Sequence, residues 1–246
     1  MINDFPQRKR ENTTVETDIA FRERVVATFR SMKFEFPKRP EELTIPIYRQ
    51  GIMIAHLRPL HAEFIPQEVR FLMEWRNQNR EAFLTWVTST KESTMRWILE
   101  ELLPREDRIL FFAETLDGVP FGHIGLTKFD FARRSCEIDN VLRGKTGTIQ
   151  GGMTLAIQAL MDWGFCFLKA HSMYLRVFAD NERAINFYMQ NELQMVKRVP
   201  LQRVQEGNII RWVETEEQPG EVPEKYLLYM RPNREGYPGM SHSARQ

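Results

Sequence analysis

The hydrophobic and polar positions near the middle of the chain change their spacing within a short stretch. Glu137 and Asp139 alternate with Ile138, which is the two-residue period of a β-strand. Beyond a glycine-rich segment, apolar residues recur every three or four positions and predict an amphipathic helix packed on a sheet. The apolar stripe of this helix comprises Met153, Ala156, Ile157, Leu160, Met161, Gly164 and Leu168.

Four glycines, Gly144, Gly147, Gly151 and Gly152, separate the predicted strand from the helix. Glycine lets backbone N–H groups approach a ligand closely, and the first turn of a helix adds unpaired N–H donors and partial positive charge. The order strand, glycine turn, helix therefore predicts an anion site, with a diphosphate as the expected ligand. An ordinary flexible turn is the alternative interpretation of the same glycines.

Two other phosphate-binding loops do not fit this stretch. Gly144, Lys145 and Thr146 imitate the end of a P-loop, but Asp139 stands where that motif requires its first glycine. The chain also lacks a G-x-G-x-x-G sequence, the fingerprint of dinucleotide-binding domains. Neither an NTPase nor a dinucleotide-dependent enzyme is therefore favoured.

Residues 1–50 are predicted to form an extension ahead of the main domain. Residues 1–17 are polar and expected to be disordered, whereas residues 18–32 place apolar side chains at helical spacing with Asp18 as the N-cap. Prolines at positions 37, 40 and 46 then interrupt the chain. The apolar face of this one helix covers either the flank of the domain or a partner subunit.

The rest of the chain alternates between strand-like and helix-like patterns, which is typical of an α/β (α+β) domain. An Asp117-Gly118 turn between two strand-like runs predicts a β-hairpin, so much of the sheet is antiparallel. We expect a mixed, mostly antiparallel sheet of about seven strands flanked by helices over residues 51–231, and a disordered tail over residues 232–246. Strands are expected at 51–60, 108–115, 119–130, from 134 onward, and at 172–178, 193–203, 208–214 and 225–230, with helices at 66–78, 91–103 and 182–191.

Composition narrows the functional class only slightly. The net charge of +1 over 246 residues argues against nucleic acid as the main partner, because binding to phosphate backbones usually requires a basic excess. The sequence has no apolar run of about 18 residues and no signal-peptide pattern, so we expect a cytoplasmic protein without membrane contact. The two cysteines and five histidines lack metal-ligand spacing, and no metal is expected.

The segment from Val177 to Tyr188 (VFADNERAINFY), following the glycine turn and its helix, resembles the Gcn5-related N-acetyltransferase family. The resemblance extends from about Ile52 to Met230. It implies a sheet whose central strands splay apart to admit the pantetheine arm of acetyl-CoA, with the glycine turn around the pyrophosphate. Met153 stands where the family usually has a small residue. In this respect the chain resembles the branch of the family that contains amino-sugar acetyltransferases. The W-R-N sequence at positions 75–77 is similar to that branch and to acetyltransferases of ribosomal-protein N-termini.

The resemblance implies catalytic roles for three residues. Tyr188 matches the general acid that protonates the departing thiolate. Glu137 resembles the glutamate that acts as a base, directly or through water, and Asp139 lies on the same strand face. Either carboxylate alternatively holds the substrate ammonium or pairs with Arg133, Arg134 or Arg143. His123, on the neighbouring strand, is interpreted as a buried core or rim residue.

The same resemblance assigns the contacts to acetyl-CoA. A backbone N–H near Val141 or Leu142 matches the group that polarises the thioester carbonyl. Asn181 matches a residue that contacts the cofactor, although it is equally suited to cap the helix that follows. Arg143 is the expected flanking cation. The backbone donors expected around the diphosphate are those of Gln150, Gly151, Gly152, Met153 and Thr154.

These features predict an acetyl-CoA-dependent N-acetyltransferase that modifies the primary amine of a small molecule. An amino sugar, free or nucleotide-linked, is the first expectation for the acceptor. An acetyltransferase of protein N-termini is the alternative within the enzyme class, and an acyl-CoA-binding module without activity is the alternative outside it. A homodimer is the expected assembly, through the N-terminal helix or an exposed strand edge.

Overall fold

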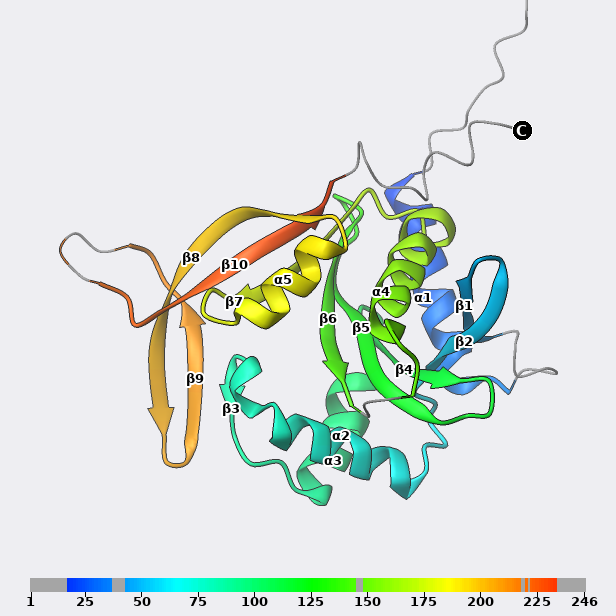
Figure 1. Cartoon of the computed structure of the whole chain (residues 1–246), viewed down its shortest axis with the longest axis horizontal. Coiled ribbons are helices and arrows are strands. Elements are labelled where there is room, and N and C mark those ends of the chain that lie inside the picture. Colours follow the sequence, from blue (N-terminus) through cyan, green and yellow to red (C-terminus); the bar gives the residue numbers. More distant parts are fainter. Residues whose placement is uncertain (1–16, 37–42, 145–147, 218–219, 221, 234–246) are drawn as a thin grey trace, which may run out of the picture.

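A computed structural model shows a single mixed sheet with helices on both faces (Figure 1). It describes residues 17–36, 43–144, 148–217, 220 and 222–233. The strands are β1 (Ile45–Arg49), β2 (Ile52–Pro59), β3 (Thr85–Trp86), β4 (Ile109–Thr115), β5 (Pro120–Asp130), β6 (Ser135–Arg143), β7 (Ser172–Phe178), β8 (Leu193–Glu206), β9 (Ile209–Glu214) and β10 (Lys225–Pro232). The helical segments are α1 (Asp18–Phe34), α2 (Pro66–Gln78), η2 (Arg80–Ala82), α3 (Lys91–Trp97), η3 (Ile98–Leu102), α4 (Gly152–Asp162), η4 (Trp163–Phe167) and α5 (Glu182–Gln190).

The strand order is β1-β2-β4-β5-β6-β7-β10-β8-β9-β3. This sheet of ten strands corrects the expected number of about seven, whereas the mixed and mostly antiparallel character is confirmed. Two short edge strands account for part of the difference. β1 pairs with β2 at one edge, and the two-residue β3 pairs with β9 at the other. Neither has enough alternating residues to be recognised from its pattern alone.

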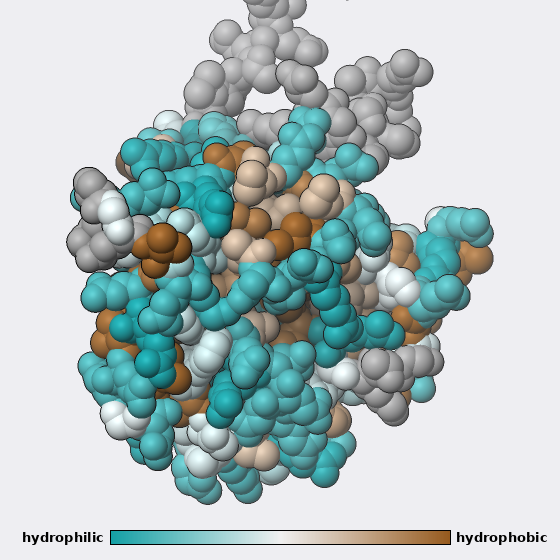
Figure 2. All heavy atoms as spheres, turned by 60° about the vertical axis from the view of Figure 1, so that its left-hand side comes forward, coloured by the Kyte–Doolittle hydropathy of each residue, from teal (hydrophilic) through white to brown (hydrophobic). Residues whose placement is uncertain are grey.

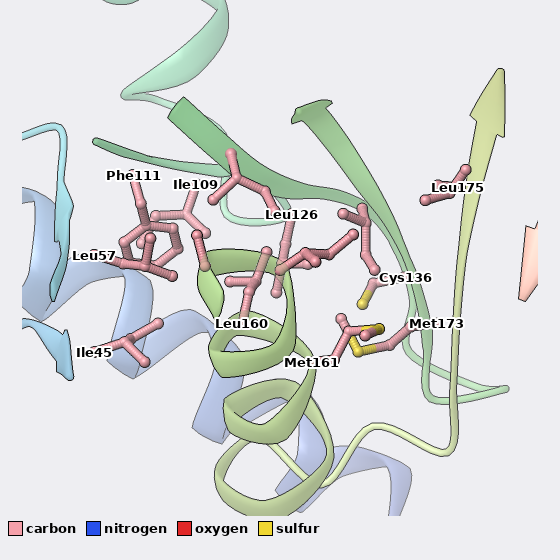
Figure 3. Close-up of a cluster of buried hydrophobic side chains, with 14 of the residues drawn as sticks. Ile45, Leu57, Ile109, Phe111, Leu126, Cys136, Leu160, Met161, Met173 and Leu175 are labelled. Atoms are coloured by element: carbon pink, nitrogen blue, oxygen red, sulfur yellow. The ribbon is translucent and has the colours of Figure 1, made fainter. Parts of the chain in front are cut away.

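Alternating side chains of β4 show how the two faces are covered. Ile109 and Phe111 belong to the core under α1 and α4, whereas Leu110 and Phe112 belong to the core under α2 and η3. The two-residue period of the strand sends successive side chains to opposite faces. Figure 3 shows the first core, with strand side chains such as Phe111 directed at Leu160 of α4.

The N-terminal helix covers the flank of its own domain. Phe21, Val25 and Phe29 of α1 are fully buried within the chain and belong to the same core as α4. This resolves the alternative between the domain flank and a partner subunit in favour of the flank. Because β1 joins the sheet, the sheet begins before Gly51, where the main domain was expected to start. Most of the segments expected to be disordered, residues 1–17 and 232–246, lie outside the described residues. The expectation is wrong at their inner ends, because Thr17 caps α1 and β10 extends to Pro232.

The sheet opens between β6 and β7. These strands form the one parallel pair in the described sheet, and their pairing runs only from Ser135–Ser172 to Glu137–Tyr174. Beyond this point they diverge, as Figure 1 shows for the C-terminal half of β6. The predicted splay of the central strands is therefore present, and it leaves room beside the end of β6.

A β-bulge interrupts β6 next to this opening. In the pairing with β5, His123 faces Leu142 and Gly125 faces Asp139, so Asn140 and Val141 together oppose one residue. Asn140 has a φ of 53°, in the left-handed region. The extra residue shifts the alternation of side chains along β6. As a result, Ile138 and Val141 both pack against the α4 core. The bulge therefore turns the end of β6 relative to its beginning.

No helix among the described residues is long and apolar enough to cross a membrane.

Candidate functional site

A pocket of about 530 Å³ lies where β6 ends and α4 and α5 begin. It brings together four segments that are far apart in the sequence: the end of α2, the end of β6, the start of α4, and α5. Nine of the predicted site residues line it. They are Val141, Leu142, Arg143, Gly151, Gly152, Met153, Thr154, Asn181 and Tyr188.

The start of α4 has the form expected for an anion site. Gly151 is the N-cap with a φ of 67°, a conformation that favours glycine, and no side chain caps the helix. The first N–H groups of α4 therefore lack a side-chain acceptor. A Cβ on Gly152 would lie 2.8 Å from the Phe121 ring, so only glycine lets the helix approach β5 this closely. Lys145, Thr146 and Gly147 of the predicted turn lie outside the described residues.

Met153 does not fill the cradle with its side chain. It is 8% exposed and belongs to the core beneath α4. A Cβ added to Gly122 would lie 2.5 Å from the Met153 Sδ, so the missing side chain on β5 makes room for the methionine. Met153 is the position where the sequence departs from the family pattern. The absence of a side chain at Gly122 of β5 accommodates this larger residue.

Tyr188 is buried at the wall of the pocket. It belongs to the core between α5 and the sheet, and it is 7% exposed. Burial, reinforced by the negative charge of Asp139, raises the pKa of its hydroxyl well above the usual value. The phenol is therefore protonated at neutral pH and available as a proton donor.

Two predicted cofactor contacts have structural partners of their own. The Asn181 side chain accepts a hydrogen bond of 3.2 Å from the Ala184 N–H, so this residue caps α5 and also lines the pocket. Gln150 is exposed and is not among the residues that line the pocket. Its carbonyl accepts a hydrogen bond from Arg49 of β1, which fastens the turn ahead of α4 to the edge of the sheet.

Glu137 and Asp139 also do not line the pocket, and they differ in their surroundings. The Glu137 carboxylate pairs with Arg176 at 2.8 Å and with Lys128 at 3.1 Å, and its side chain is 4% exposed. The Asp139 side chain is 34% exposed and contacts Arg108 at 3.3 Å. Its electrostatic effect on Tyr188 places it near the pocket wall. Both carboxylates therefore pair with an arginine, but the partners are Arg176 and Arg108 and not one of the three expected from the sequence.

Sequence reasoning missed several residues of this region. Arg183 and Phe187 line the pocket from α5, where they lie one helical turn apart, but their spacing to Tyr188 did not indicate a shared face. Gln78 and Asn79 line it from the end of α2, for which the sequence carried no signal. No group of His, Cys, Asp and Glu residues within the described ranges is arranged to hold a metal ion.

Comparisons with known proteins agree with this arrangement. The family model described as acetyltransferase (GNAT) family matches residues 70–191, about half of the chain. A comparison with curated protein sequences gives no significant match.

Two solved structures illustrate the similarity of fold. A spermidine N-acetyltransferase from Vibrio cholerae, in complex with CoA and spermine, is 16% identical, with a TM-score of 0.54 over 71% of this chain and 92% of its own. A probable acetyltransferase of the GNAT family from Chromobacterium violaceum is 15% identical, with a TM-score of 0.56 over 79% of this chain and 87% of its own. At such identities the likeness concerns the fold. With its matched sequence, splayed sheet and glycine turn, the chain belongs to the acetyltransferase (GNAT) family.

Proposed function

We propose that the protein transfers the acetyl group of acetyl-CoA to a primary amine. One observation carries this proposal: Tyr188, the uncapped start of α4 and the bulged end of β6 all meet at one pocket. Acyl transfer to an amine requires an anchor for the donor, a hydrogen-bond donor for the thioester carbonyl, and a proton for the leaving thiolate. The pocket offers a candidate for each requirement.

The residues around α4 suit the diphosphate of CoA. Gly151, Gly152 and the next residues present backbone N–H groups at a helix start, where partial positive charge favours an anion. Arg143 and Arg183 line the same pocket and supply full positive charges. When bound, acetyl-CoA supplies the reactive thioester. Tyr188 lines the same pocket as this anchor.

The β6 bulge and Tyr188 are proposed to act on different atoms of the thioester, the bulge on its oxygen and Tyr188 on its sulfur. Asn140 and Val141 share one partner residue in β5, so a backbone N–H at Val141 or Leu142 is the proposed donor to the thioester oxygen as it gains charge. The Tyr188 hydroxyl then gives its proton to the departing thiolate. Its raised pKa keeps that proton in place until the C–S bond breaks.

Asp139 is the better candidate for the base that keeps the amine neutral. Its side chain is partly exposed and close enough to Tyr188 to raise the pKa of that hydroxyl. Glu137 remains a candidate, but two cations already neutralise its charge and its side chain is almost fully buried. We therefore propose that Asp139, directly or through water, accepts the amine proton, and that Glu137 supports the strand.

The class of acceptor is a primary amine, and its finer identity rests on sequence resemblance. Met153 favours an amino sugar, free or nucleotide-linked, whereas the W-R-N sequence is similar both to that branch and to acetyltransferases of ribosomal-protein N-termini. The similar Vibrio cholerae structure contains spermine, so polyamines belong in any acceptor panel. Acetylation of protein N-termini is not favoured by any contact in the described structure. A homodimer also remains a prediction, and sedimentation of the purified protein tests it.

Two measurements test the proposed function. Calorimetric titration with CoA tests the pocket, and Arg183→Gln, which removes a lining cation, is expected to weaken binding. Incubation with acetyl-CoA and amino sugars, polyamines or N-terminal peptides, followed by mass spectrometry, identifies any acetylated product. CoA binding without a product from any amine indicates a module without activity, and absence of both binding and product contradicts the proposal.

A further inference from the structure

Two arginines, Arg108 and Arg76, lie near the carboxylate of Asp139. Arg108 contacts Asp139 at 3.3 Å through one guanidinium nitrogen, while its Nε is buried without a hydrogen-bond partner. Arg76 of α2 is close enough to be affected by the charges of both Asp139 and Arg108. All three side chains lie near the α2 side of the sheet, opposite the α4 core that holds Ile138.

The two guanidinium groups have one carboxylate between them, that of Asp139. Arg76 donates a hydrogen bond of 3.1 Å to the Thr85 carbonyl and lies over the Phe83 ring, 4.2 Å from its centroid. Burial lowers its pKa, which shows that its charge is poorly solvated. Arg108 lies over the Trp97 ring, 5.3 Å from its centroid. Within the described ranges, Asp139 is the one carboxylate that pairs with either arginine, so one positive charge is left without a partner.

The carboxylates of Glu137 and Glu214 are already matched by cations and a hydroxyl group. Arg176 of β7 pairs with Glu137 at 2.8 Å and with Glu214 of β9 at 2.7 Å. Glu214 also accepts a hydrogen bond from the Tyr229 hydroxyl at 2.7 Å, and Lys128 takes the second oxygen of Glu137. This network has no excess of negative charge to attract a polycation. Figure 2, which brings the β8–β9 side forward, shows that this side of the molecule is largely hydrophilic.

We propose that Arg76 and Arg108 bind an anionic group of the acceptor, a carboxylate or a phosphate, beside the amine that is acetylated. Guanidinium groups suit such oxygens because they offer several N–H donors in one plane. An anionic group would supply the missing negative charge and accept hydrogen bonds from the accessible part of the Arg108 guanidinium, whose side chain is 20% exposed. The inference rests on the proposed function, and it separates this protein from an enzyme that selects polyamines.

Matched acceptors test the inference directly. Each pair has the same amine with and without the anionic group: glucosamine 6-phosphate against glucosamine, and β-alanine against β-alaninamide, with spermidine as a polycation. Calorimetric titration into the CoA-saturated protein measures acceptor binding while the diphosphate site is filled. We expect the anionic member of at least one pair to bind at least about tenfold more tightly than its partner. The pair that responds distinguishes a phosphate site from a carboxylate site.

Three variants assign the preference to the two arginines. Arg108→Gln and Arg76→Gln are each expected to reduce the preference to about twofold or less, without changing the affinity for CoA. Arg70→Gln is the control, because Arg70 is an exposed residue on the same helix as Arg76 and pairs with Glu74 there. Circular dichroism verifies that each variant is folded. If one variant does not fold, the comparison of paired acceptors in the wild-type protein still decides whether the anionic group is preferred.

The inference and the proposed function fail in different ways. Equal binding of both members of each pair, tighter binding of spermidine, or no binding of any anionic member overturns the anion site. A preference that persists in both Arg108→Gln and Arg76→Gln also overturns it. If anionic members bind but no amine releases CoA from acetyl-CoA, the anion site stands and the proposed transferase activity fails.

Discussion

The imidazole Nδ1 of His123 lies 2.6 Å from the carbonyl oxygen of Asn140. A carbonyl oxygen only accepts hydrogen bonds, so the proton is assigned to Nδ1. His123 is 3% exposed, and burial lowers its pKa to about 4, so the ring is neutral at physiological pH. A buried, uncharged donor thus holds the left-handed residue of the β6 bulge, directly before the amides assigned to the thioester.

Removing this donor is expected to reduce catalysis more than cofactor binding. His123→Phe leaves the Asn140 carbonyl without its partner, so the bulge relaxes and the following amides move. We expect kcat to fall by about ten- to a hundredfold, the effect of displacing one donor to the thioester oxygen. The KM for acetyl-CoA is expected to stay within about twofold. His123→Asn, which retains an N–H donor, is expected to recover part of kcat, and equal kcat in all three proteins rejects the positioning role.

The same histidine predicts a pH dependence of stability. Its pKa is about 4 in the folded protein and about 6.5 when exposed. Below about pH 6.5 the unfolded chain therefore binds a proton that the folded protein does not, and stability is lost as the pH falls toward 4. Between pH 7 and pH 5 this contribution amounts to about 2 kcal/mol. Urea unfolding at pH 7 and at pH 5 measures how much stability is lost between them. We expect this loss to be about 2 kcal/mol smaller in His123→Phe than in the wild-type protein, and identical losses contradict the role of His123.

Two glycines of one helical segment provide a matched test of the cofactor cradle. Gly152→Ala places a Cβ 2.8 Å from the Phe121 ring and displaces the start of α4, so we expect the Kd for CoA to rise about tenfold, equivalent to losing one charge-assisted hydrogen bond. Gly164→Ala in η4 meets the flexible Met173 side chain at 2.7 Å, away from the pocket. It is expected to alter stability but not CoA affinity. Calorimetric titration measures the Kd for CoA in both variants, and an equal rise in this Kd argues against the cradle.

The two carboxylates of β6 are expected to respond differently to neutralisation. Asp139→Asn should lower kcat by about a hundredfold, the usual contribution of a general base, and its partly exposed ion pair with Arg108 should make the loss of stability smaller than in Glu137→Gln. Glu137→Gln should lower the free energy of unfolding by about 3 kcal/mol, because it leaves buried Arg176 without full compensation. Kinetics and urea unfolding of both variants separate the roles. A larger loss of kcat in a stable Glu137→Gln protein would reverse the assignment.

Much of the fold could be predicted because its central elements carry strong periodic patterns. The strand at residues 172–178 matches β7, and the predicted helix at 182–191 differs from α5 by one residue. The Asp117-Gly118 turn also lies between β4 and β5 as expected. The short β1 and β3 were missed because their pairing depends on distant strands, which local patterns do not encode.

The cofactor side of the site was more predictable than the acceptor side. The glycine turn and Tyr188 lie in contiguous motifs, and both line the pocket. The ion pair that neutralises Glu137 could not be predicted from the sequence. Its partner, Arg176, is 39 residues away along the chain and reaches Glu137 only across the splayed sheet. The bulge at Asn140 was equally hidden, since its register depends on His123 of the neighbouring strand.

The central claim, acetyl transfer at this pocket, is tested most directly by the turnover of Tyr188→Phe. The substitution removes one hydroxyl and keeps the ring that packs against Phe187, so CoA binding is expected to stay unchanged. With an amine that the wild-type protein acetylates, the account predicts a fall in the rate of CoA release of at least about a hundredfold. Turnover by Tyr188→Phe at the wild-type rate would contradict it.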